Sequence, residues 1–183
     1  MNIFLTFFLI SFQYFFNEPV NILIVFDTKE GKTESFAKKV YEGANSVEGV
    51  SVKLKSVENV DLNDIVNSDA IIIGSPVYNA NPSPKILDFI SEWPFEKQIM
   101  KNKIGAVFVT AGGISAGEEL AQMSIIQSMM VFGMIIVGGD DWKSAFGASL
   151  VSDELNLLSQ KKYFNEKAIK LGKRVALLTK KMI

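Results

Sequence analysis

From Val20 onward, short apolar runs alternate with amphipathic helical segments, and this alternation leaves few folds open to the chain. The first run, Val20–Phe26 (VNILIVF), is continuously apolar and mostly branched, which is typical of a strand buried on both faces. Strands alternating with helices favour an α/β fold with a doubly wound parallel sheet and helices on both faces. Further strands are predicted over 50–57, 70–73, 104–109 and 134–137, and helices over 33–44, 62–66, 83–93, 118–132 and 160–180.

The second predicted strand, 50–57, alternates apolar and polar residues strictly, so one of its faces is exposed. Such a strand belongs at the edge of the sheet, as it does in the five-stranded order 2-1-3-4-5. Neither an internal repeat nor a long linker interrupts residues 20–183, so we predict one domain over this range.

Residues 1–19 form a hydrophobic N-terminal extension. Its segment 3–16 (IFLTFFLISFQYFF) has no charge and holds six of the 14 Phe residues. It is shorter than the roughly 20 residues that span a bilayer. Three interpretations stay open: a signal peptide or membrane anchor, an extension upstream of the true start site, and a helix packed on the domain. We expect a cytoplasmic protein, with a membrane-associated or secretory location through 3–16 as the alternative.

The residue types that the chain lacks exclude several kinds of site. There is no Cys and no His, which excludes disulfides, iron–sulfur clusters, His-ligated metals and Ser-His or Cys-His catalysis. We predict no metal site, and any catalysis must use other groups or a cofactor that brings its own chemistry. The 19 basic and 20 acidic residues nearly balance, which argues against a nucleic-acid partner.

In an open parallel sheet, ligands bind at the carboxyl ends of the strands. Polar or Gly-rich loops follow the predicted strands there, over 27–33, 74–83, 110–117 and 138–147, and we expect one composite pocket. The first loop runs into helix 33–44, whose N–H groups, with the Thr28 and Thr33 hydroxyls, suit a phosphate. The alternative is an ordinary helix N-terminus capped by Thr33.

Two other classes of phosphate-binding protein are each excluded by a single feature of the sequence. Gly31-Lys32-Thr33 ends like a Walker A motif, but Phe26 stands where that motif needs its first Gly. A two-component receiver domain needs a phospho-acceptor Asp after the third strand, where this chain has Gly74-Ser75-Pro76. We therefore expect neither a nucleoside triphosphatase nor a receiver domain.

Residues 24–40 resemble the FMN-phosphate signature of the flavodoxin family. The matching positions are an apolar triplet ending in Phe26, then Thr28, Gly31, Thr33, Ala37 and Val40. Residues 74–83 (GSPVYNANPS) resemble the isoalloxazine loop of WrbA-type NAD(P)H:quinone oxidoreductases and are similar to NADPH-dependent FMN reductases. Residues 110–119 resemble the WrbA-type glycine loop with one extra residue. The resemblance covers about 20–183 and implies a flavodoxin-like fold.

The resemblance implies FMN as the cofactor and NAD(P)H as the co-substrate. It also implies that no side chain is catalytic, because flavin N5 carries the redox chemistry. Aromatic candidates for a wall that stacks the acceptor are Tyr78, Trp93, Phe95 and Phe132. The residues expected to bind FMN are Thr28, Lys29, Glu30, Gly31, Lys32, Thr33, Pro76, Val77, Tyr78, Asn79, Ala80, Asn81, Thr110, Ala111, Gly112, Gly113, Ile114 and Gly117.

The chain also departs from the WrbA-type pattern. Phe132 replaces the His beside the flavin, and Tyr78 replaces an Arg that is frequent in the isoalloxazine loop. The insertion that helps to shape the family's tetramer is absent between Val57 and Ala70. We expect a homo-oligomer, either a dimer or a tetramer.

Three functions stay open. The first is an FMN-dependent oxidoreductase that passes two electrons from NAD(P)H to a small quinone-type acceptor. The second is a flavodoxin-type electron carrier, and the third is a flavodoxin-like module without turnover. Near-neutral loops, with Asn79 and Asn81 where carriers are acidic, favour the oxidoreductase. The intact set Thr28, Gly31 and Thr33 argues against a module that has lost FMN.

Overall fold

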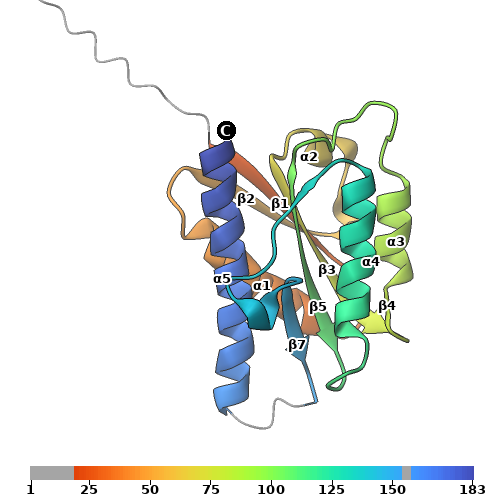
Figure 1. The fold of residues 1–183 in the computed structure, drawn as a ribbon, viewed down its shortest axis with the longest axis vertical. Helices are drawn as coiled ribbons and strands as arrows, with labels where there is room; N and C mark the ends of the chain where they lie inside the picture. Colours follow the sequence, from red (N-terminus) through yellow and green to blue (C-terminus); the bar gives the residue numbers. More distant parts are fainter. Residues whose placement is uncertain (1–18, 154–157) are drawn as a thin grey trace, which may run out of the picture.

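The computed structural model describes residues 19–153 and 158–183, in which a twisted sheet lies between two layers of helices (Figure 1). Its main strands follow the order β2-β1-β3-β5-β6, which confirms the predicted order 2-1-3-4-5 and the doubly wound α/β fold. The interpretations of the hydrophobic extension concern residues 1–18, outside the described residues. The strands are β1 (Val20–Phe26), β2 (Val50–Ser56), β3 (Ala70–Tyr78), β5 (Ile104–Ala111) and β6 (Ile135–Ile136).

Two short strands, rather than one, fill the last position of the sheet. Strand β6 pairs only with Ile104 and Gly105 of β5, whereas β7 (Ala148–Val151) pairs in parallel with the second half of β5. Between them the chain leaves the sheet over 138–147 and forms the 3₁₀ helix η2 (Trp142–Ser144). The prediction of one strand over 134–137 missed β7, because four residues are too few to show a period.

Helices cover both faces of the sheet (Figure 1). Helices α1 (Lys32–Asn45) and α5 (Leu158–Met182) pack on one face, and α3 (Pro84–Ser91) and α4 (Glu118–Val131) pack on the other. The short helix α2 (Leu62–Val66) and the 3₁₀ helix η1 (Val57–Asn59) connect β2 to β3. Among the residues that the structure describes, no helix combines the length and the apolar composition that crossing a bilayer requires.

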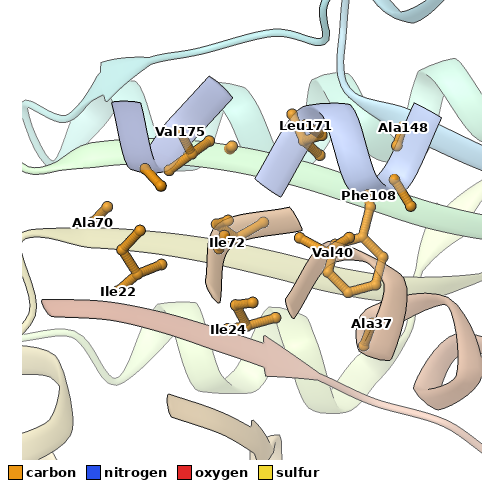
Figure 2. Packing of buried hydrophobic residues seen from close by; sticks show 14 of the residues in the cluster. Ile22, Ile24, Ala37, Val40, Ala70, Ile72, Phe108, Ala148, Leu171 and Val175 are labelled. Carbon is orange, nitrogen blue, oxygen red and sulfur yellow. The ribbon is translucent and has the colours of Figure 1, made fainter. Parts of the chain in front are cut away.

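Alternate residues of the central strands supply two cores. Ile22 and Ile24 point toward α1 and α5 and belong to one buried cluster with Val40 of α1 and Leu171 of α5 (Figure 2). Leu23, which lies between them in the sequence, joins the other cluster beneath α3 and α4. A strand with both faces buried must be apolar at every position, which explains the continuous run of β1.

Glycines let α1 and α5 approach each other closely. A Cβ on Gly43 would lie 1.9 Å from the carbonyl oxygen of Ile169, and one on Gly172 would lie 2.0 Å from that of Val40. Any side chain at either position would push the helices apart. The two glycines therefore allow α1 and α5 to pack closely against each other on one face of the sheet.

An ion pair fixes α2 beneath the edge strand β2. The Asp64 side chain is 3% exposed, and it accepts hydrogen bonds from Lys55 and, at 2.9 Å, from Lys53. The amide of Asp61 donates a further bond to it. Burial raises the pKa of Asp64, but the bonds from Lys55, Lys53 and Asp61 outweigh burial and lower this pKa to about 2.

Candidate functional site

A cleft of about 270 Å³ opens where β1, β3 and β5 end. The loop after β1, the end of β3 and the end of β5 form most of its wall, so three of the four predicted loops meet there. No residue of the fourth, 138–147, lines the cleft, because the chain leaves the sheet early and β7 takes the place beside the end of β5. The lining residues are Thr28, Lys29, Glu30, Lys32, Thr33, Pro76, Val77, Tyr78, Thr110, Ala111, Gly112 and Ser152.

The loop before α1 has the conformation of an anion-binding helix start. Gly31 is the N-cap, with a left-handed φ of 77°, and its N–H donates to the Thr28 hydroxyl at 3.0 Å. That bond leaves the hydroxyl proton of Thr28 for a ligand. The first N–H groups of a helix have no intrahelical acceptor, so those of Lys32 and Thr33 are also free to bind a ligand.

Thr33 lies inside the first turn of α1 and does not cap it. Its side chain is 1% exposed, and its hydroxyl oxygen lies 2.8 Å from that of Thr110 at the end of β5. One hydroxyl of this pair donates to the other, which leaves one proton for a further acceptor. The alternative interpretation of Thr33 as the N-cap is wrong, because Gly31 occupies that position.

A tight hairpin at the end of β3 places Tyr78 on the rim. Tyr78 pairs with Asn81 of the two-residue strand β4 (Asn81–Pro82), and the turn between them has φ values of 49° at Asn79 and 64° at Ala80. Two consecutive positive φ values are characteristic of a type I′ turn. Of the predicted residues here, Pro76, Val77 and Tyr78 line the cleft, whereas 79–81 form the hairpin tip outside it.

The Tyr78 hydroxyl faces negative charge. Its ring is 39% exposed, and burial, followed by the charges of Asp27 and Glu30, raises the pKa of its hydroxyl above the usual value. The phenol therefore stays protonated throughout the neutral range and can donate a hydrogen bond.

Of the predicted loop 110–117, only the first residues line the cleft, and two of them, Thr110 and Ala111, are the last residues of β5. Thr110, Ala111 and Gly112 line the cleft, whereas the predicted residues Gly113, Ile114 and Gly117 do not. A Cβ on Gly112 would meet one atom, Asp153 Oδ2 at 3.5 Å, so protein atoms leave space beside it.

Gly117 has a structural part in the loop after β5. It caps α4 with a φ of 95°, and a Cβ there would lie 2.3 Å from that of Ala80. It thereby allows the start of α4 to pack against the tip of the β3–β4 hairpin.

Sequence analysis missed Ser152, which follows β7. Its hydroxyl lies 3.2 Å from Lys32 Nζ, and its N–H donates to the carbonyl of Ala111 at 2.8 Å. The length of β5 could have indicated this residue. The second half of β5 needs a neighbouring strand, and the predicted strand 134–137 is too short to pair with all of β5. The polar residue after that strand would then belong to the carboxyl edge.

Three of the four aromatic residues predicted to form the acceptor wall lie elsewhere. Trp93, Phe95 and Phe132 form an edge-to-face cluster, with ring centroids 5.3 Å apart for Trp93–Phe132 and 5.5 Å for Phe95–Phe132. They follow α3 and α4, which run antiparallel to the strands, so their ends lie at the amino edge of the sheet. The prediction is wrong for these three residues, and Tyr78 alone of the four lines the cleft.

Comparisons with known proteins agree on the type of fold. Residues 62–148 match the family described as NADPH-dependent FMN reductase. The chain is 34% identical to a flavodoxin from Clostridium saccharobutylicum over 120 residues, which cover 66% of this chain and 74% of the relative. It is 33% identical to a flavodoxin from Aquifex aeolicus over 126 residues, which cover 66% of each chain.

Two further similarities concern WrbA-type and quinone-related proteins. An NAD(P)H dehydrogenase (quinone) from Afipia carboxidovorans is 26% identical over 141 residues, covering 64% of this chain and 69% of that protein. The crystal structure of a flavodoxin, WrbA-like protein from Agrobacterium tumefaciens superposes with a TM-score of 0.73 at 20% identity. That superposition covers 88% of this chain and 98% of the other, and at this identity it supports the fold alone.

Proposed function

Because the chain belongs to the flavodoxin-like superfamily, we propose that it is an FMN-dependent oxidoreductase that passes two electrons from NAD(P)H to quinone-type acceptors. The match to NADPH-dependent FMN reductases and the relative named NAD(P)H dehydrogenase (quinone) support this function. The observation that carries the proposal is the α1 N-terminus, which opens into a cleft bordered by Tyr78 and by the end of β5.

The residues of the cleft fit the phosphate of FMN. The N–H groups of Lys32 and Thr33 point out of the start of α1, and the positive end of the helix dipole favours an anion there. The hydroxyl of Thr28 lies beside the same turn and keeps its proton for a ligand. Gly31 supports this cradle without obstructing it, because a Cβ at that position would meet no atom within 4 Å.

The rest of the cleft would hold the flavin ring. Pro76–Tyr78 form one side, and Thr110–Gly112 form the other. Gly112 leaves open space, and Tyr78 offers an aromatic face together with a protonated hydroxyl. Bound FMN supplies the two-electron redox chemistry, so the absence of His and Cys does not prevent catalysis. This chain's residues then bind the cofactor, orient it and exclude water.

The charges at the rim favour a small uncharged acceptor over a protein that docks by charge. Lys29 and Lys32 are balanced by Asp27 and Glu30, and Lys32 lies 3.6 Å from Glu30. A rim without a dominant sign gives little electrostatic steering, so added salt should leave the rate nearly unchanged.

Steady-state kinetics test the proposal. The protein loaded with FMN should oxidise NADH or NADPH with benzoquinone as the acceptor and with no other protein present. Parallel initial-rate lines at several fixed quinone concentrations are expected, because donor and acceptor use one cleft in turn. Intersecting lines, or no NAD(P)H oxidation by fully loaded protein, would overturn the proposal.

A flavodoxin-type electron carrier is the second candidate, favoured by the two flavodoxin relatives at 33% and 34% identity. A carrier would bind FMN equally well but would be reduced only through a separate reductase. The benzoquinone assay, repeated with and without a flavodoxin reductase, distinguishes the two functions.

The proposal includes a homo-oligomer, a dimer or a tetramer. Large apolar side chains on the outer face of α4 support it, since Leu120 is 65% exposed and Val131 is 68% exposed. Analytical ultracentrifugation of the FMN-loaded protein measures the subunit number directly, and a monomer at micromolar concentration would contradict this part of the proposal.

A further inference from the structure

We propose that the outer face of helix α5 docks on an anionic lipid bilayer, and that the apolar segment 3–16 is a second anchor. The proposal is independent of the proposed oxidoreductase function. It rests on the charge of α5, on the side chains that α5 exposes, and on the place where the described chain begins.

Helix α5 concentrates the positive charge of the protein. It contains eight Lys and Arg residues and a single acidic residue, Glu166. The helix therefore carries a net charge of +7, although the whole chain has a net charge of −1. An even distribution of charge would not produce such a difference, so α5 is a cationic surface on an otherwise acidic protein.

The positive side chains follow one side of the helix. Ala168, Leu171 and Val175 face the sheet and α1, which leaves the opposite side of α5 to solvent. That side carries exposed basic residues through its whole length, with Leu177, 43% exposed, among them. The basic residues of this cationic face are Lys162, Lys170, Lys173, Arg174, Lys180 and Lys181.

Part of the cationic face is engaged within the protein, and part is available for a partner. Lys170 lies 3.1 Å from Asp140, and Arg174 donates to the carbonyl of Gly139 at 2.9 Å. Lys162 lies 3.9 Å from Glu166, which is exposed on the same side of the helix. Lys173 and Lys181 have no hydrogen bond or ion pair with any of the described residues. These two side chains can reach lipid headgroups without breaking an existing contact.

The described part of the chain begins beside the last turn of α5. The N–H of Val20, the first residue of β1, donates to the carbonyl of Gly49. Lys180 Nζ donates to the carbonyl of Glu48 at 2.6 Å, so the 48–49 turn touches both the start of β1 and the end of α5. Figure 1 shows the start of β1 close to the C-terminal end of α5. Segment 3–16 ends four residues before Val20 in the sequence, and Val20 lies at the same end of the domain as Lys180.

Stable association with a membrane usually requires two weak anchors in one protein. A short apolar anchor alone binds a bilayer marginally and reversibly, and a neighbouring polybasic patch makes the association stable. Segment 3–16 is too short to span the hydrocarbon core but is apolar enough to enter the interface. An acidic protein or a nucleic acid would use the cationic face equally well, but neither would explain a run of 14 uncharged residues that ends four residues before Val20 in the sequence.

Flotation of the full chain with lipid vesicles tests the proposal, because aggregated protein sinks whereas vesicle-bound protein floats. The probes are phosphatidylcholine vesicles with and without phosphatidylserine. We expect tighter binding when phosphatidylserine is present, and we expect added salt to weaken it. Equal binding to both vesicles, or no flotation with either, would overturn the proposal and would leave α5 as a surface for an acidic macromolecule.

Matched variants locate the surface. Lys173→Gln with Lys181→Gln should lower the partition into phosphatidylserine vesicles about 25-fold, since each Lys near an anionic membrane contributes about a factor of five. The control is Lys85→Gln with Lys97→Gln, two exposed lysines on α3 and in the connection after it, because α3 packs on the opposite face of the sheet. Equal losses in the two pairs would show that net charge, and not the face of α5, decides binding.

The apolar anchor needs its own variant. Phe7→Asp with Phe8→Asp in the full chain should weaken binding to both kinds of vesicle by more than about tenfold, because charged residues enter the interface poorly. Thermal unfolding measured by circular dichroism should be the same for all variants, which separates loss of binding from loss of fold. If the Phe variants bind as the wild type does, segment 3–16 is not an anchor and the proposal of two anchors is wrong.

Discussion

The hydroxyl oxygens of Thr33 and Thr110 lie 2.8 Å apart in the base of the cleft and connect the first turn of α1 to the end of β5. Both residues are buried, with 1% and 6% exposure, so little water reaches either hydroxyl when the other is removed. A hydrogen bond between two residues of a binding cleft can therefore also stabilise the fold around that cleft.

We predict that Thr33→Val lowers the free energy of unfolding of the FMN-free protein by about 1–3 kcal/mol, because Thr110 is left buried without a partner. Thr33→Val with Thr110→Val should cost less than the two single changes added together. Urea unfolding of the four proteins of this double-mutant cycle gives the coupling energy. Additive losses would show that the two hydroxyls do not depend on each other.

Thr28→Val should raise the dissociation constant for FMN about tenfold. The change removes the acceptor of the Gly31 N–H and a hydroxyl donor beside the helix start, and bonds to a charged phosphate are stronger than neutral ones. Fluorescence titration of the flavin measures the constant. The control is Thr179→Val in α5, which removes a buried hydroxyl far from the cleft and should leave FMN affinity unchanged.

Gly112→Val should abolish FMN binding while the domain stays folded. Protein atoms leave space beside Gly112, so the new side chain would occupy the volume that the ligand needs. Gly113→Val is the matched control, because Gly113 does not line the cleft and a Cβ there would meet no atom within 4 Å. The flavin absorbance of each purified protein gives its FMN content, and full content in the Gly112 variant would place the flavin elsewhere.

The buried Asp64 should make stability depend on pH below about pH 4. Its pKa is about 2 in the folded protein, against a usual value of 3.8, so its ionised form favours folding. The stabilisation is complete above about pH 4 and is lost as pH falls through the folded pKa. We expect about 1–2 kcal/mol, since Lys53 is largely exposed and solvent screens its charge.

Urea unfolding between about pH 2 and pH 5 measures this loss of stability. Asp64→Asn should lower stability at neutral pH and flatten the profile over this interval. Asp88→Asn is the control, because Asp88 is exposed on α3 and should leave the profile as it is in the wild type. An unchanged profile in the Asp64 variant would assign the acid dependence to other carboxyl groups.

The turnover of the proposed enzyme should vary little between about pH 6 and pH 8. The chain has no His that could titrate there, and Tyr78 stays protonated because its pKa is raised. Initial rates with saturating NAD(P)H and benzoquinone across this interval check the expectation. A steep profile would indicate a proton transfer by a protein group that the site does not provide.

The local sequence determined those features that depend on residues close together in the chain. Strands that are buried on both faces must be apolar at every position, so the runs of β1, β3 and β5 could be predicted without coordinates. The Thr28–Thr33 loop could be predicted as well, because it lies between such a run and an amphipathic helical pattern. The predicted helices begin and end within about two residues of the observed ones, because their apolar spacing is regular.

Only the tertiary structure decided which distant residues meet. Strand β7 is stable because it pairs with β5, and Ser152 reaches the cleft for the same reason, although four residues show no pattern of their own. Trp93, Phe95 and Phe132 are aromatic and could stack on a flat ligand. They lie at the amino edge of the sheet, opposite the cleft, because α3 and α4 run antiparallel to the strands. The chemical type of a side chain determines what that residue can bind. The path of the chain, set by the packing of whole strands and helices, decides which residues stand together to bind it.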